Sequence, residues 1–100
     1  MVVEIAQIEV VPGQEDAFAA AYRTAHRLLI ESPGCRGARM TRGVESPSRF
    51  IGIVEWDSVD DHLANFRETE RYERYRELLV PYLAAPPLVE HFTDLGVHTF

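Results

Sequence analysis

The spacing of apolar positions changes along the chain, and each change marks an expected element. Residues Val2–Val11 are rich in β-branched side chains and stop at Pro12-Gly13, which predicts a strand followed by a turn. Between residues 14 and 31 apolar side chains recur every three or four residues, and Pro33-Gly34 closes the run, so the pattern predicts a helix. The apolar stripe of this helix consists of Phe18, Tyr22, Ala25 and Leu29.

Three more strands follow from the same reasoning. Residues Cys35–Glu45 and Arg49–Trp56 flank the short polar connection Ser46-Pro47-Ser48, which is typical of an antiparallel hairpin. After two consecutive prolines, residues Leu88–Leu95 predict the last strand. The tail, Gly96–Phe100, has too little pattern to be assigned to an element.

Two helical pieces are expected between the hairpin and the last strand. Ser58, with Asp61 three residues later, resembles a capping box and opens a short helix that runs to about Phe66. Thr69 is expected to cap a second helix, which Pro81 brings to an end. The apolar stripe of the second helix consists of Tyr72, Tyr75, Leu79 and Tyr82.

This order of elements, βαββααβ, predicts an α+β protein of the ferredoxin-like sandwich class. A single domain spanning 1–100 would hold a four-stranded antiparallel sheet with helices on one face. Residues Phe50, Val54 and Trp56 point to one side of their strand, whereas Ile51 and Ile53 point to the other. Because an open apolar sheet face favours association and two-fold symmetry is its commonest form, we predict a homodimer through that face.

Composition excludes several partners. The net charge of −6 disfavours binding to nucleic acid, and no apolar run approaches the roughly 20 residues that span a bilayer. The first residues lack the basic character of a signal peptide, and the single cysteine, Cys35, cannot form an internal disulfide. We therefore expect a cytoplasmic protein without nucleic-acid or membrane partners.

The chain carries no recognisable cofactor motif. Its four histidines have no close metal-ligand spacing and no cysteine pair to support them, and its glycines form no strand–turn–helix phosphate fingerprint. Cys35 follows a Pro-Gly turn with no evident base beside it, which argues against a catalytic thiol. The sequence thus predicts neither a metal nor a nucleotide or flavin cofactor.

Four short segments, taken in order, resemble the antibiotic biosynthesis monooxygenase (ABM) family of dimeric α/β-barrel proteins over about residues 2–95. The segments are Val10-Val11-Pro12-Gly13-Gln14-Glu15, Pro33-Gly34-Cys35, Phe50-Ile51-Gly52-Ile53-Val54-Glu55-Trp56-Asp57-Ser58 and Val89-Glu90-His91-Phe92. The resemblance implies a dimeric α/β barrel. The family includes cofactor-free quinone-forming oxygenases, haem-degrading enzymes and members without an assigned reaction, so the fold alone does not fix the chemistry.

Individual positions match the cofactor-free oxygenases of polyketide pathways in part. Trp56 stands at their strand-end tryptophan, and His62, six residues later, stands where they place a proton-donating tyrosine. Arg76, twenty residues after the tryptophan, matches their active-site arginine, whereas Gly52 replaces an asparagine. The resemblance therefore implies that His62 transfers protons and that Arg76 stabilises an oxyanion.

The haem-degrading branch fits less well. Its asparagine, tryptophan and axial histidine correspond to Gln7, Phe66 and Arg76 in this chain. Because an arginine that stays protonated cannot ligate iron, the resemblance does not extend to haem.

Together with these residues, the resemblance implies a small cofactor-independent monooxygenase acting on an aromatic polyketide-like or quinol substrate. Alternatives are a non-catalytic dimeric ligand-binding or stress-associated protein, or a cyclase, isomerase or lyase that uses the same pocket. Each candidate residue also has a purely structural alternative: a surface position for His62, the dimer seam for His91, a surface ion pair for Arg76 and core packing for the tyrosines. The expected pocket residues are Trp56, Phe66, Tyr72, Tyr75, His91, Tyr22 and His26.

Overall fold

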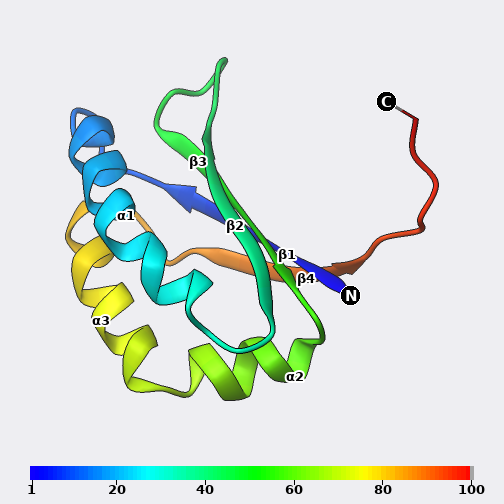
Figure 1. The fold of residues 1–100 in the computed structure, drawn as a ribbon. Coiled ribbons are helices and arrows are strands. Elements are labelled where there is room, and N and C mark those ends of the chain that lie inside the picture. The colour runs from blue at the N-terminus through cyan, green and yellow to red at the C-terminus, as the bar shows by residue number, and fades with distance from the viewer. Residues whose placement is uncertain (100) are drawn as a thin grey trace.

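The computed structural model describes residues 1–99 and contains one antiparallel sheet with helices on a single face (Figure 1). This arrangement confirms the predicted ferredoxin-like α+β fold. The strands are β1 (Val2–Glu9), β2 (Cys35–Arg42), β3 (Arg49–Trp56) and β4 (Leu88–Thr93). The helices are α1 (Glu15–Ile30), α2 (Val59–His62) with a π-helical turn (Leu63–Arg67), α3 (Glu70–Leu79) and a short 3-10 turn (Val80–Tyr82).

The sheet has the strand order β2-β3-β1-β4, so the first and third strands lie in its centre. On β3 buried and less buried residues alternate, as expected for a strand with one face against a core. Phe50, Val54 and Trp56 face the helices, and Ile51 and Ile53 lie on the opposite face, as the alternation predicts. β1 alternates in step with β3, since Glu4 pairs with Val54.

The predicted stripe of α1 is the part of that helix that enters the core. Phe18, Tyr22, Ala25 and Leu29 are all buried. The Phe18 ring packs on Phe50 of the central strand, with 4.8 Å between the ring centroids. Since burying a side chain of this kind contributes about 1.5–3 kcal/mol, this helix face holds α1 firmly on the sheet.

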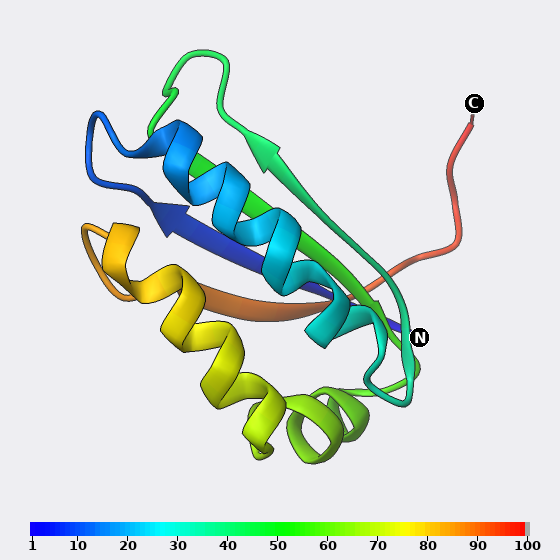
Figure 2. The ribbon, with the colours of Figure 1, turned by 60° about the vertical axis from the view of Figure 1, so that its left-hand side comes forward.

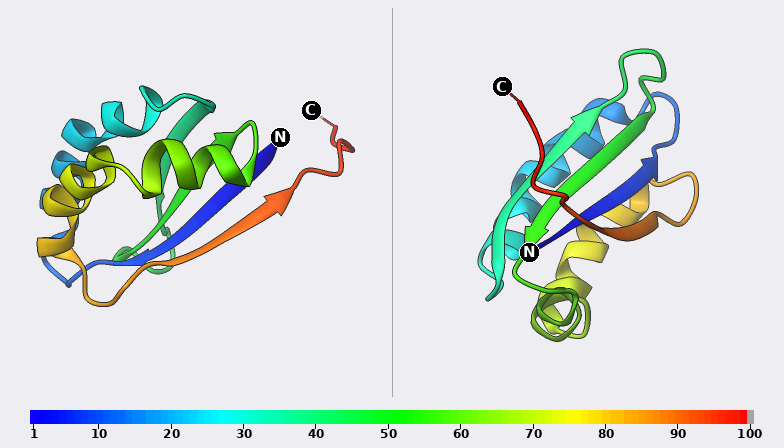
Figure 3. Two further views of the ribbon diagram at one scale, coloured as in Figure 1. Left: turned by 90° about the horizontal axis from the view of Figure 1, so that it is seen from below. Right: turned by 90° about the vertical axis from the view of Figure 1, so that its right-hand side faces the viewer.

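Three strands, β1, β2 and β4, end two or three residues before their predicted ends. β1 ends at Glu9, and Val10 forms only an isolated bridge with Leu83. β2 ends at Arg42, and one further bond between the strands follows, from the Gly43 N–H to the Arg49 carbonyl at 2.7 Å. β4 ends at Thr93, and the following segment leads away from the sheet (Figure 3). Of the unassigned tail, only Phe100 lies outside the described residues.

Both predicted caps stand at the expected N-cap positions, but only Ser58 caps its helix with its side chain. The Ser58 side chain accepts a hydrogen bond from the Asp61 N–H, 3.1 Å away, and so caps α2. Thr69 is the N-cap residue of α3 by position, but its hydroxyl turns back and donates to the Phe66 carbonyl at 2.7 Å. The expected helix to Phe66 is α-helical only as far as His62 and then widens into the π-helical turn.

The face of the sheet opposite the helices is not covered by any segment of residues 1–99 (Figures 2 and 3). Ile5 of β1 and Ile53 of β3 are paired on this face. On the edge strand, Leu88 is 67% exposed and Phe92 is 48% exposed. No helix within residues 1–99 is both long and apolar enough to cross a membrane.

Candidate functional site

A cavity of about 880 Å³ lies between the helices and the sheet. Its sheet side includes Ala6 and Gly52, which are paired across β1 and β3. Because neither residue has a long side chain, the sheet side is low and flat at this point. Aromatic side chains from the helices line the other side: Tyr22, Phe66, Tyr72 and Tyr75. A planar ring therefore fits the shape and chemistry of this space.

A buried row of polar side chains stands at the wall of the cavity. Glu4 Oε1 accepts a hydrogen bond from Trp56 Nε1 at 2.9 Å and lies 3.3 Å from His62 Nε2. On its other side, His62 Nδ1 lies 2.7 Å from His91 Nε2. The indole of Trp56 stacks on the imidazole of His62 with 5.0 Å between centroids, which fixes the plane of the His62 ring. The row thus runs from β1, through α2, to the edge strand β4.

Burial shifts the pKa values of Glu4 and His62, which belong to this row. It raises the pKa of Glu4, while the Trp56 hydrogen bond and the nearby Arg67 oppose that rise. Burial, then His91 and then Arg67, lower the pKa of His62 to about 4. His62 is therefore neutral near pH 7. With Glu4 ionised, one tautomer satisfies every contact: His62 Nε2–H donates to Glu4, and His62 Nδ1 accepts from His91 Nε2–H.

Both oxygen contacts of Glu4 fall on Oε1, the atom that accepts from Trp56 and His62. Glu4 also lines the cavity, as does His62. A carboxylate held on one oxygen and open to a ligand on the other is suited to removing a proton from that ligand.

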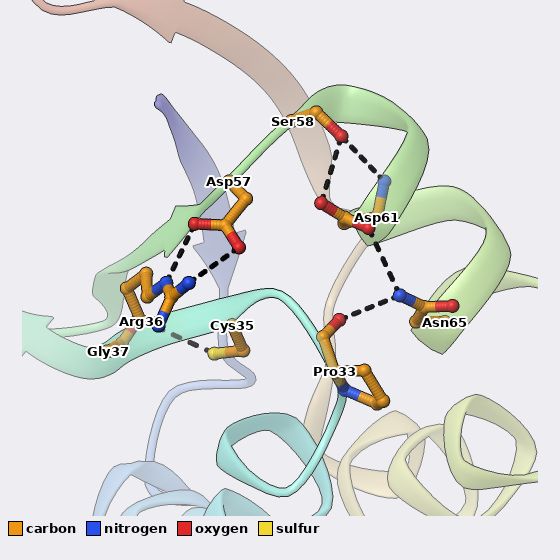
Figure 4. Close-up of polar contacts among 8 residues, drawn as sticks. All are labelled: Pro33, Cys35, Arg36, Gly37, Asp57, Ser58, Asp61 and Asn65. Atoms are coloured by element: carbon orange, nitrogen blue, oxygen red, sulfur yellow. Dashed lines mark hydrogen bonds and ion pairs between the residues drawn. The ribbon is translucent and has the colours of Figure 1, made fainter.

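The position of His62 depends on a clamp at the start of α2 (Figure 4). The Asn65 amide donates to the Pro33 carbonyl at 2.8 Å and to the Asp61 carboxylate at 3.2 Å. Gly34 packs against Asp61, and its φ of +89° is one that glycine adopts without strain. The turn before β2 therefore holds the helix that carries His62.

A second contact joins the same two turns on the outside. Arg36 donates from Nε and Nη2 to the two carboxylate oxygens of Asp57, at 2.7 and 2.9 Å. The Asp57 N–H is bonded to the Gly34 carbonyl at 2.8 Å. Together these bonds fix the chain between the end of β3, at Trp56, and the first turn of α2.

The predicted site residues fall into two groups. Six of them line the cavity: His62, Arg76, Phe66, Tyr72, Tyr75 and Tyr22. Three do not. Trp56 is fully buried behind His62 and reaches the site only through Glu4, because the imidazole covers its ring. His91 contacts His62 instead of the cavity, and His26 turns to β2, where its Nε2 lies 2.8 Å from the Ala38 carbonyl.

Arg76 lies at the opening of the cavity. Its side chain is exposed and lines the space, and none of the expected partners, Glu73, Glu77 or Asp60, forms an ion pair with it in the described structure. A second cation accompanies it. Arg67 also lines the cavity, and its guanidinium carbon lies 4.8 Å from the centre of the Tyr72 ring. Within residues 1–99, the charged residues that line the cavity are therefore three arginines, Arg39, Arg67 and Arg76, and two acids, Glu4 and Glu73.

Glu4 and Arg67 are the two site residues that the sequence interpretation missed. The signal for Glu4 is its place in β1: it is the acidic residue that alternates in phase with Ala6 and Ile8, on the core side of the strand. An unpaired acid on a buried strand face is rare enough to indicate a site. Arg67 has no comparable signal, because the π-helical turn that directs it inward does not follow from residue spacing.

The fold and the cavity define a ferredoxin-like α+β protein whose helices enclose an aromatic pocket beside a buried acid–histidine pair. A family model for antibiotic biosynthesis monooxygenases matches residues 1–78. The chain belongs to this family. Curated relatives include YczJ of Bacillus subtilis (strain 168), an uncharacterised protein that is 30% identical over 95 residues, covering 95% of this chain and 100% of YczJ.

Solved structures agree with this assignment. A Bordetella bronchiseptica protein assigned as an antibiotic biosynthesis monooxygenase has a TM-score of 0.90 and 35% identity, covering 94% of this chain and 96% of its own. A Nitrosomonas europaea protein with the same assignment has a TM-score of 0.81 and 25% identity, covering 95% and 99%. SnoaB, a cofactor-independent oxygenase from Streptomyces nogalater, has a TM-score of 0.82 at 14% identity over 96% and 94%, a likeness of fold alone.

Proposed function

We propose that this protein is a small cofactor-independent monooxygenase that oxidises an aromatic polyketide-like or quinol substrate. The observation that carries the proposal is the Glu4–His62–His91 row, which places a carboxylate of raised pKa in the wall of an aromatic cavity. Membership of the family and the fold shared with SnoaB support it. In this chemistry the substrate itself supplies the electrons that dioxygen needs.

The first step is removal of a proton from the substrate. A planar phenol or anthrone binds between the low floor at Gly52 and the aromatic wall, with its acidic proton near Glu4. The carboxylate takes that proton, and His62 Nε2–H holds the carboxylate oxygen in place. The proton transfer expected of His62 alone is thus shared by two residues. Glu4 takes the proton, and His62 holds the Glu4 carboxylate in position.

The second step is reaction of the carbanion with dioxygen. A carbon–oxygen bond forms and gives a hydroperoxide, which loses water after Glu4 returns the proton. For an anthrone, the remaining C–H proton of the ring carbon and the outer oxygen of the hydroperoxide leave together as water, so two C–H bonds and the O–O bond break and one oxygen atom stays in the new carbonyl. For a phenol, the O–H and the single C–H of the oxidised carbon are the two bonds to hydrogen that are lost. Arg76 and Arg67 stabilise the negative charge that develops on the substrate oxygen.

Oxygen uptake with a panel of anthrones and quinols tests the proposal. With an anthrone, wild type should consume one O₂ for each carbonyl formed and release water; with a quinol, one O₂ for each quinone and release of hydrogen peroxide would indicate oxidation without oxygen insertion. Glu4→Gln keeps an oxygen for Trp56 and His62 but cannot take a proton, and it should lower turnover about 10²-fold or more. Glu45→Gln, in an exposed loop, is the matched control. Equal rates for Glu4→Gln and wild type would remove Glu4 from the mechanism.

A cyclase or isomerase is the second candidate, because the row at His62 moves a proton and does not itself use oxygen. Anaerobic incubation in D₂O separates the two. Exchange of a substrate C–H for deuterium without oxygen uptake, abolished in Glu4→Gln, would favour the isomerase class. Substrate that is bound but neither exchanged nor oxidised would favour the binding protein.

The open sheet face supports a proposed homodimer, and the composition supports a cytoplasmic location. The face carries apolar residues from the central strands, Ile5, Ile51 and Ile53, which one chain leaves uncovered. Pairing two such faces would bury them both.

A further inference from the structure

The hydroxyl of Tyr22 is buried and has no hydrogen-bond partner within residues 1–99. The residue as a whole is 8% exposed and lines the cavity. A buried hydroxyl without a partner costs about 1–3 kcal/mol, and such groups in folded proteins are few. A phenylalanine at this position would avoid that cost, so the hydroxyl has a use that the protein alone does not show.

Tyr22 projects from the middle of α1, and Tyr75 projects from α3, the helix beside it (Figure 2). Both rings line the same cavity as Glu4. Burial, then Cys35 and Glu4, raise the pKa of Tyr22 to about 12. The Tyr22 phenol therefore stays protonated over the working pH range and acts as a donor, never as a base.

A donor without a partner calls for an acceptor on the ligand. Glu4 does not accept this bond, because the Tyr22 hydroxyl has no hydrogen-bond partner within residues 1–99. An aromatic ring that carries this acceptor fits the apolar part of the wall, which includes Phe18, Leu29 and Val54. A ketone or quinone carbonyl on an aromatic ring supplies such an acceptor, because it accepts a hydrogen bond without carrying a charge.

We infer that Tyr22 is a specificity-determining residue that donates a hydrogen bond to a carbonyl oxygen of the ligand, at a point distinct from the Glu4 contact. The ligand is accordingly an aromatic phenol that also bears a ketone. This inference rests on the proposed function only in taking the cavity as a site for an aromatic ligand, and it requires no oxygen chemistry.

The test measures binding of two matched probes in the absence of oxygen. Hydroxytetralone is a two-ring phenol with a ketone, and tetrahydronaphthol has the same rings without the ketone. Wild type should bind hydroxytetralone more tightly. Tyr22→Phe should lower the affinity for hydroxytetralone about 10-fold, which is the scale of one good hydrogen bond. The affinity for tetrahydronaphthol should not change. Tyr82→Phe makes the same chemical change outside the cavity and should alter neither affinity.

Unfolding of the ligand-free variants supplies a second readout. Tyr22→Phe should be as stable as wild type or more stable, because it removes an unpaired buried hydroxyl. A clear loss of stability would show that the hydroxyl has a structural partner, and this would overturn the inference. Three binding results would overturn it as well. They are an equal loss of affinity for both probes in Tyr22→Phe, an unchanged affinity of that variant for hydroxytetralone, and no binding of either probe to wild type. If the binding pattern holds while oxygen uptake is absent, the oxygenase proposal fails and the Tyr22 assignment stands.

Discussion

His91 of the edge strand β4 and the buried His62 of α2 share one hydrogen bond, with 2.7 Å between His91 Nε2 and His62 Nδ1. The two residues are separated by 29 positions in the chain. Since His91 does not line the cavity, its influence on chemistry there passes through His62. The contact sets which nitrogen of His62 carries the proton, and it helps to keep that ring neutral.

The first prediction concerns this contact. His91→Leu removes the hydrogen bond to His62 and the electrostatic effect of His91 that lowers the pKa of His62, so that pKa should rise from about 4. His91→Gln keeps an N–H donor and should therefore raise the pKa of His62 less than His91→Leu does. An NMR titration of the His62 ring measures both shifts. A pKa that is the same in all three proteins would show that His91 does not position His62.

The second prediction concerns stability against pH. Folding lowers the pKa of His62 from 6.5 to about 4, so the unfolded chain binds a proton in this interval and the folded chain does not. The free energy of unfolding should therefore fall as pH falls through this window, by up to about 3 kcal/mol. Glu4 has the opposite effect on the free energy of unfolding. Because folding raises its pKa, its contribution to stability is full at low pH and is lost as pH rises.

Comparison with His62→Gln isolates the histidine. Its amide keeps hydrogen-bonding groups near Glu4 and His91 but does not titrate. Urea unfolding at pH 7 and pH 4.5 should show a smaller loss of stability in the variant than in wild type. An identical loss in both proteins would mean that His62 titrates normally in the folded state.

The third prediction concerns the clamp that holds α2. A Cβ added at Gly34 would lie 2.7 Å from Asp61 Cβ, in a backbone conformation with φ of +89°. Gly34→Ala should destabilise the protein by more than about 1 kcal/mol and displace His62, because backbone strain and overlap add. Gly37→Ala, where a Cβ meets nothing within 4 Å, is the matched control in chemical denaturation. Equal stability of the two variants would contradict this account of the turn.

The sequence predicted the fold because its main signals are local. Helical spacing in α1, the hairpin connection and the Ser58 cap each depend on residues within a few positions of one another. The site depends instead on contacts across the fold. Glu4 and Trp56 are 52 positions apart, and they meet because β1 and β3 pair in a register that spacing does not reveal. Thr69 shows the limit of local rules, since its hydroxyl donates to the Phe66 carbonyl and makes no cap hydrogen bond with α3.

The last prediction concerns the proposed homodimer. Ile53 lies at the centre of the open sheet face, paired with Ile5 across the central strands. Ile53→Asp would place a carboxylate where the second copy is expected, and burying that charge without a partner is far more costly than leaving it in water. The variant should therefore be a folded monomer in light scattering where wild type is a dimer. Val44→Asp, at a loop residue that is 86% exposed, adds the same charge away from the sheet and should remain dimeric. A molar mass of one chain for wild type at micromolar concentration, measured by light scattering, would contradict the proposal. A dimeric Ile53→Asp would show that the copies associate through another surface.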